Sequence, residues 1–288
     1  MTHASPAYIL TISCPDTLGI VAAVSGFLSG LGCNIFDSQQ FGDSVSGLFF
    51  LRVHFEAPAE IADKAEIERR FSDAVARRFS MDWSLHDAAR KARVLIMVSR
   101  LGHCLNDLLY RYRTGTLAIE IPAIVSNHRD FYQLAAWHNV PFHYLPVTAA
   151  TKAQQEARLL EIVESEQIDL VVLARYMQIL SPELCARLEG RCINIHHSFL
   201  PSFKGARPYH QAFSRGVKLI GATAHYVTTE LDEGPIIEQE VERVDHRLTP
   251  EELEGVGRDI ESVVLARAMR YHVEHRVLRN GNKTVVFR

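Results

Sequence analysis

The sequence predicts an α/β protein of two domains, in which a small β-α-β-β-α-β domain precedes a larger, doubly wound and mostly parallel sheet. Three observations support this. The 288 residues exceed one small domain. Up to about residue 85, segments with strand signals and segments with helical apolar spacing follow one another in the order β-α-β-β-α-β. From residue 93 onward, continuous apolar runs alternate with helical segments, which is typical of strands buried on both faces.

The first domain is expected to contain four strands and two helices in the ferredoxin-like order. Asp16 is a candidate N-cap for the first helix, and Gly32 ends that helix. The expected strands cover residues 8–13, 35–41, 48–55 and 81–85, and the expected helices cover residues 17–31 and 59–79. The polar stretch 86–92 is the expected linker, so the predicted division is 1–85, 86–92 and 93–288.

The second domain is expected to alternate strands and helices. Its strand candidates are 94–98, 121–126, 141–146, 169–174, 192–196, 221–227 and 235–244. Its helix candidates are 106–113, 131–137, 151–166, 182–188 and 250–271. The chain then ends in a predicted hairpin, because Asn280-Gly281 fits a type I′ turn.

Composition limits the function classes. The formal charge of −3 creates no basic field for nucleic acid or anionic lipid, so neither partner is expected. Five cysteines, an odd number without CxxC spacing, indicate reduced thiols and a cytoplasmic location. The first residues lack the pattern of a signal peptide, and no run reaches about 18 apolar residues, so no membrane span is expected.

The stretch NIHHSFLPSFKG, residues 194–205, carries the candidate chemistry. Asn194 and His196 are two residues apart on a strand and share a face, at the carboxyl end where active sites of such sheets gather. Asp232, in ELDEGP, is the candidate carboxylate partner. The alternative is that His196 is only a polar residue at a strand end.

A metal site is the other alternative, and the sequence argues against it. Zinc needs three or four converging ligands. His196 and His197 are adjacent, so they point to opposite faces of a strand, while His210 and His225 are isolated in the sequence. We expect no metal.

The segments NIHHSFLP and ATAHYVTTELDEGPII resemble the formyltetrahydrofolate-dependent formyltransferases over about residues 93–245. The resemblance implies that Asn194, His196 and Asp232 are catalytic. It also implies that LARYMQILSPEL contacts the pterin ring of a folate, although the same residues fit a core strand that runs into a helix capped by Ser181. The substrate-binding residues implied in this way are Met177, Gln178, Ile179, Leu180, Val227 and Gly102.

Two departures from the glycinamide ribonucleotide transformylases concern the acceptor. Those proteins hold the acceptor's phosphate on a Gly-Ser-Asn loop, but here His103 and Cys104 follow Gly102. His197 stands where they have proline. MVSRLGHCLNDLLYR and the motifs above resemble the formyltetrahydrofolate deformylases, which implies hydrolysis of 10-formyltetrahydrofolate by water. The folate is then a substrate and no cofactor is expected; a formyltransferase with an amine acceptor and a non-catalytic sensor remain alternatives.

Other residues near the motif have weaker signals. His197, His210 and Arg207 are further candidates for the site, or they stabilise its loop. Lys204-Gly205 is expected to form a turn.

CPDTLGIVAAVSGFLSGLGCNI resembles an ACT domain, a regulatory module that often pairs across a subunit interface. The resemblance implies a homo-oligomer and an amino-acid effector, glycine or methionine, at a regulatory site. Its matching residues are Asp16, Gly19, Ile20 and Asn34. The alternative is that the domain serves oligomerisation alone.

Overall fold

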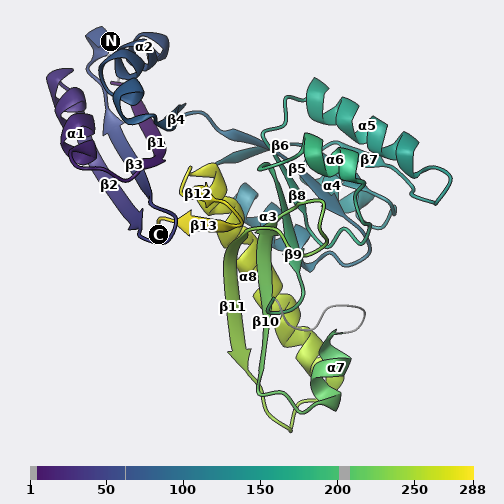
Figure 1. Cartoon of the computed structure of the whole chain (residues 1–288). Helices are drawn as coiled ribbons and strands as arrows, with labels where there is room; N and C mark the ends of the chain where they lie inside the picture. The colour runs from purple at the N-terminus through teal and green to yellow at the C-terminus, as the bar shows by residue number, and fades with distance from the viewer. Residues whose placement is uncertain (1–4, 62, 201–207) are drawn as a thin grey trace. The chain divides into compact units, whose positions relative to one another are not determined.

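The structure, a computed structural model, describes residues 5–61, 63–200 and 208–288, and only the backbone of Pro208 (Figure 1). The chain forms two compact units, one from Met1–Lys91 together with Glu274–Arg288 and one from Ala92–Val273. Within the described part of the chain, no helix is both long and apolar enough to cross a membrane.

The first unit contains a four-stranded antiparallel sheet in the order β2-β3-β1-β4. Its elements in chain order are β1 (Ala7–Pro15), α1 (Ile20–Gly30), β2 (Asn34–Asp43), β3 (Leu48–Glu56), α2 (Lys64–Ala74) and β4 (Asp82–Asp87). This order confirms the predicted β-α-β-β-α-β pattern. Gly32, at φ 76°, follows α1 in the left-handed conformation that favours glycine after a helix.

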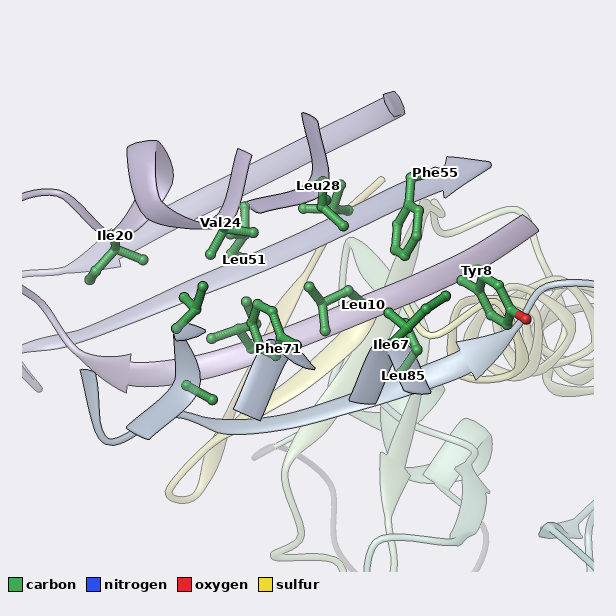
Figure 2. Packing of buried hydrophobic residues seen from close by; sticks show 14 of the residues in the cluster. Tyr8, Leu10, Ile20, Val24, Leu28, Leu51, Phe55, Ile67, Phe71 and Leu85 are labelled. Atoms are coloured by element: carbon green, nitrogen blue, oxygen red, sulfur yellow. The ribbon is translucent and has the colours of Figure 1, made fainter. Parts of the chain in front are cut away.

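Both helices cover the same face of this sheet (Figure 2). Ile20, Val24 and Leu28 recur at helical spacing along α1 and point into the core. Phe71 of α2 packs edge-on against Trp83 of β4, with ring centroids 4.8 Å apart. The apolar residues on one face of the strands pack against these helices.

Two local predictions in this unit were wrong. The segment 59–79 is not one helix: short 3₁₀ turns at Ala59–Ile61 and Ala76–Phe79 flank α2, and Asp63 caps α2 by accepting a hydrogen bond from Ala65 N at 3.1 Å. Asp16 does not cap α1. The helix begins only at Ile20, and its N-cap is Gly19, which has no side chain that could cap the helix.

The C-terminal hairpin, β12 (Val277–Asn280) and β13 (Lys283–Val286), belongs to the first unit, although the predicted boundary placed it with the second. Leu278 and Phe287 cover Phe50 on the face of β3 that the helices leave open. The hairpin is present as predicted, but Asn280 pairs with Lys283, so the two turn residues are Gly281-Asn282 and not Asn280-Gly281.

The second unit contains a seven-stranded sheet in the order β11-β10-β9-β8-β5-β6-β7 (Figure 1). The five strands from β5 to β9 run parallel, while β10 pairs antiparallel with both β9 and β11. The mostly parallel, doubly wound prediction is therefore confirmed. The strands are β5 (Ala92–Val98), β6 (Ile119–Ser126), β7 (Phe142–Tyr144), β8 (Leu170–Leu173), β9 (Cys192–His196), β10 (Leu219–Tyr226) and β11 (Ile236–Arg243).

Helices cover this sheet. Apolar residues of α5 and α6 pack on β5, β6 and β8, whereas α8 packs along β9–β11 and against α3. The helix α7 was not predicted from the sequence. The helices are α3 (His103–Arg113), α4 (Tyr132–Trp137), α5 (Lys152–Ser165), α6 (Pro182–Arg187), α7 (Pro208–Ser214) and α8 (Pro250–Val273). Ser181 caps α6 as expected, since its Oγ accepts from Leu184 N at 3.1 Å.

Candidate active site

The pairing of β9 with β10 brings four polar side chains onto one face. His196 lies directly opposite Thr223, and Asn194 lies opposite His225. Directly opposed residues of an antiparallel pair share a face, so the period of two places all four together. The register of β10 against β11 shifts at His225, a local irregularity of the kind that re-aims side chains beside active sites.

The loop between β10 and β11 carries Asp232 back to this face. Tyr226 N donates to Pro235 O at 2.9 Å and closes the base of the loop. A Cβ on Gly234 would lie 1.7 Å from Tyr226 O, so only glycine allows the backbone to approach this closely. Asp232 itself has φ 57°, a left-handed conformation in which Asp and Asn are enriched among non-glycine residues.

Asp232 lies between two histidines. Its Oδ2 is 3.3 Å from His196 Nδ1, and its Oδ1 is 3.7 Å from His225 Nε2. The other ring nitrogen of His196, Nε2, is buried and has no hydrogen-bond partner within the described residues. The arrangement fixes one side of the His196 ring and leaves the other nitrogen available.

His225 orients Asn194. His225 Nδ1 lies 2.9 Å from Tyr226 O and therefore carries the hydrogen, which leaves Nε2 as an acceptor. Asn194 Nδ2 is 3.3 Å from that Nε2 and donates to it. An amide nitrogen has two hydrogens, so the second remains free to donate to a ligand.

The pKa shifts define the charges at the site. The hydrogen bond from His196 lowers the pKa of Asp232, so this carboxylate stays ionised at neutral pH. Burial lowers the pKa of His225, which keeps its imidazole neutral. Burial and then the charge of Arg175 lower the pKa of His197 to about 4.

Asn194, His196 and Asp232 line one cavity of about 280 Å³. Met177 and Ile179 are apolar yet more than half exposed, and they present side chains to this cavity. The other predicted substrate-binding residues on its wall are Gln178, Leu180 and Val227. Gly102 does not line it: Gly102 precedes α3, and a Cβ there would lie 2.3 Å from the Phe131 ring.

Buried polar groups hold the segment that follows β8. Met177 N donates to Ser99 Oγ at 3.0 Å, and Ser99 Oγ donates to Asn127 Oδ1 at 2.7 Å. These bonds tie the segment to the ends of β5 and β6. The exposed apolar residues of this segment are thus held in place by a rigid network.

A second buried cluster surrounds Glu261 of α8, which is 1% exposed. Its Oε1 accepts from Tyr209 at 2.8 Å, its Oε2 is 2.7 Å from His103 Nε2, and Arg175 Nε lies 3.4 Å away. Burial raises the pKa of Glu261, but the hydrogen bond from His103 and the charge of Arg175 outweigh it and the pKa ends below its usual range.

The Glu261 cluster also contains three side chains of the types that bind metal ions. His103, Cys104 and Glu261 offer ligand atoms within 4.8 Å of one another. Burial raises the pKa of Cys104, so its thiol stays protonated, and the Arg175 guanidinium beside Glu261 repels a cation. We therefore assign the group as an ion-paired cluster.

The segment after β9 is anchored at its start. Thr223 Oγ1 donates to Ser198 O at 2.9 Å and accepts from Leu200 N at 3.1 Å, while Gln239 Nε2 donates to Leu200 O at 3.1 Å. His210 is exposed on α7. The candidates Lys204, Gly205 and Arg207 lie outside the described residues.

The predicted regulatory residues lie in the first unit. Asp16 follows β1, and Gly19, at φ 94°, precedes α1. Asn34 is exposed at the start of β2. Ile20 is buried in the core, so its side chain does not face solvent.

Comparison with known proteins gives the family. Residues 92–269 match the model of the formyl transferase family. The chain is 50% identical over 283 residues to the formyltetrahydrofolate deformylase of Corynebacterium sp. (strain P-1), an alignment that covers 98% of both chains. This chain belongs to the formyltetrahydrofolate deformylase family. The Escherichia coli (strain K12) member is 39% identical over 285 residues, which is 99% of both chains.

Solved structures agree with membership of this family. The formyltetrahydrofolate deformylase of Burkholderia mallei ATCC 23344 has a TM-score of 0.93 at 55% identity and covers 98% of this chain and 100% of its own. A glycinamide ribonucleotide transformylase from Symbiobacterium toebii has a TM-score of 0.64 at 29% identity, covering 69% of this chain and 95% of its own.

Sequence reasoning missed three residues that the structure places at or beside the site. His225 had appeared isolated, yet its opposition to Asn194 across β9 and β10 could have been found by pairing HYV with CIN. Arg175 and Glu261 come from segments 86 positions apart. No sequence signal pointed to their contact.

Proposed function

We propose that this chain hydrolyses 10-formyltetrahydrofolate to tetrahydrofolate and formate, with Asn194, His196 and Asp232 as its catalytic residues. The observation that carries the proposal is the state of His196. Its Nδ1 is beside the ionised Asp232, while its buried Nε2, on the wall of a cavity, has no partner within the described residues. Family membership supports the substrate, because the Corynebacterium relative is a formyltetrahydrofolate deformylase.

The residues divide the reaction as follows. Water adds its oxygen to the formyl carbon, and charge develops on the formyl oxygen. The free amide hydrogen of Asn194 and protonated His196 donate to that oxygen. The C–N bond then breaks, one proton from water ends on N10, and formic acid releases the other as it ionises. Asp232 orients His196 and accepts a proton during the attack, so the coupled pair shares the proton transfers.

His225 is a positioning residue in this scheme. It touches Asn194 and not the reacting atoms, and its neutral Nε2 holds the amide in the orientation that presents a donor. Loss of one oxyanion donor typically lowers turnover about 100- to 1,000-fold. A slightly rotated Asn194 would lose part of that contribution.

The Glu261 cluster supports water as the acceptor. His103 is the first residue of α3, and its imidazole is held by Glu261 at 2.7 Å. The held imidazole takes up space at this helix start, where the free N–H groups of a helix N-terminus would favour a phosphate. A phosphorylated amine acceptor therefore does not suit this site.

The physiological role follows from the reaction. Hydrolysis releases formate for purine synthesis and restores tetrahydrofolate, so the chain balances the one-carbon folate pools of the cytoplasm. The folate is consumed as substrate. The protonated Cys104 thiol and ion-paired Glu261 support chemistry that does not need a metal ion.

The test is formate release from 10-formyltetrahydrofolate with chelator present and no amine acceptor. Turnover under these conditions supports water as the acceptor without a metal ion. If turnover appears only after an amine is added, the chain is a transferase. If folate binds without turnover under either condition, it is a sensor.

We also propose that the first unit binds glycine or methionine and mediates homo-oligomerisation. Asp16 and Gly19 lie at the turn before α1, and Asn34 is exposed at the start of β2. Isothermal titration of both amino acids into the full chain tests the effector. An Asp16→Asn variant should weaken binding, whereas the exposed Asp82→Asn variant should not. Light scattering with and without the amino acid measures the subunit number.

A further inference from the structure

Arg175 has hydrogen-bond donors that its neighbours do not use. The residue is 8% exposed, and its Nε and Nη1 atoms are buried without a hydrogen-bond partner anywhere in residues 5–61, 63–200 and 208–288. Leaving a buried donor unpaired is destabilising, and more so for a charged group. Its φ of 64° is uncommon for a non-glycine residue, so the surrounding structure holds it in this conformation.

Glu261 does not take up these donors. Its two oxygens already face Tyr209 at 2.8 Å and His103 at 2.7 Å. Arg175 Nε is 3.4 Å from Glu261 Oε2 but forms no hydrogen bond with it. Glu261 therefore stabilises the charge of Arg175 while leaving its N–H groups available to a ligand.

Arg175 lies on the wall of the cavity that holds the candidate catalytic residues. His197, whose pKa Arg175 helps to lower, stacks on His196 with ring centroids 4.9 Å apart. Arg175, His196 and His197 therefore line the same cavity. A buried cation with free donors beside a cavity is suited to a small anion.

We propose that Arg175 forms a binding subsite for a small monocarboxylate, and that this anion is the formate released in the reaction. This inference rests on the proposed function. Hydrolysis leaves formate beside the ionised Asp232, which repels it. Arg175 offers unused, buried N–H donors of a cationic group on the wall of the same cavity, so it draws the product away from Asp232 before release.

The experiment measures formate binding directly. Radiolabelled formate is equilibrated by dialysis against the full chain without folate, with nitrite as a competing anion. Arg175→Met should bind formate about 10- to 100-fold more weakly than wild type, because hydrogen bonds to charged groups contribute about 1.5–3 kcal/mol. Arg247→Met removes the same charge from a side chain that is 80% exposed, and it should bind formate as wild type does.

Two results overturn the inference. The first is that wild type binds no formate at concentrations up to about 100 mM, because a Kd above that value corresponds to a very small binding free energy. The second is that wild type and Arg175→Met bind formate with equal affinity. If Arg175→Met does not fold by circular dichroism, Arg175→Lys decides, with weakened binding supporting the subsite and unchanged binding overturning it. If the chain hydrolyses 10-formyltetrahydrofolate but its formate binding does not depend on Arg175, the subsite is excluded and the proposed function stands. Absence of formate release by wild type removes the proposed function and the assignment of the anion as product.

Discussion

Asp232 and His196 show how one pair of side chains sets the chemistry at the residue scale. The carboxylate is 16% exposed and remains ionised because His196 donates to it. A depressed carboxyl pKa stabilises the folded state above the unfolded value of about 3.9, and this contribution is lost as pH falls through the folded pKa. The charge that the proposed mechanism needs is therefore retained throughout the neutral range.

Asp232→Asn tests this pair. Asn is tolerated at φ 57° and keeps the shape of the side chain, but it removes the charge. We expect turnover to fall about 100- to 10,000-fold, while folate affinity measured by titration stays largely unchanged. Asp245→Asn, at an exposed carboxylate, is the control. Retention of turnover within tenfold would exclude Asp232 from the reaction.

His197 makes stability depend on pH. Its pKa falls to about 4 in the folded protein but is about 6.5 in the unfolded chain, so between these values the unfolded state binds more protons. Wild type should thus lose stability as pH falls from 6.5 to 4, with no further loss from this group below 4.

The matching variant is His197→Asn, studied by calorimetry between pH 7 and pH 4.5. The stability of wild type should fall more than that of the variant, by on the order of 1–2 kcal/mol. His246→Asn, which removes an exposed imidazole, should follow wild type. Parallel pH profiles for wild type and His197→Asn would contradict the assignment.

The β10–β11 loop shows how an element positions the proposed catalytic carboxylate. Its strands approach so closely at Gly234 that the loop returns Asp232 to the face of β9, and the irregularity at His225 turns that ring toward Asn194. The geometry of the proposed site therefore depends on backbone sterics as much as on the polar residues themselves.

Gly234→Ala should disturb this geometry. The new Cβ would meet backbone at 1.7 Å, so the loop must shift and Asp232 must move from His196. A displacement of about 1 Å can lower turnover roughly 100-fold, and we expect a loss of about that size in kcat. Gly255→Ala in α8, where a Cβ meets nothing within 4 Å, is the control and should retain turnover. An active Gly234→Ala would show that the loop tolerates movement.

At the scale of the whole molecule, the chain returns at its end to the unit where it began. The hairpin β12–β13 covers Phe50, which is fully buried, and the backbone of Glu274 and His275 accepts hydrogen bonds from the Arg52 side chain at 3.0 and 3.1 Å. The last residues therefore stabilise the first unit.

Phe287→Ala should destabilise the first unit by roughly 3 kcal/mol, the usual cost of removing a buried ring. The chain has two tryptophans, and Trp83 lies in the first unit. In a Trp137→Phe background, tryptophan fluorescence therefore reports the unfolding of the first unit alone. Urea unfolding followed by Trp83 fluorescence gives the change. Phe41→Ala, at a ring that is 47% exposed, is the control. Equal effects of the two substitutions would contradict the role of the hairpin.

Local patterns determined most of the elements. The helical spacing of apolar residues in α1 and the apolar run of β5 depend on neighbours in the chain, so both could be predicted from the sequence, as could the Ser181 cap. Asn194 and His196 were readable for the same reason, since a strand places residues two apart on one face.

The tertiary structure decided what depends on contacts between distant segments. The strand period could not show that His225 faces Asn194, that Glu261 pairs with Arg175 and His103, or that Phe287 covers Phe50. Such contacts depend on strand register and helix packing, which combine surfaces of many residues. The sequence by itself determined most of the elements and the catalytic candidates, whereas packing decided the charges around them and the unit to which the chain end belongs.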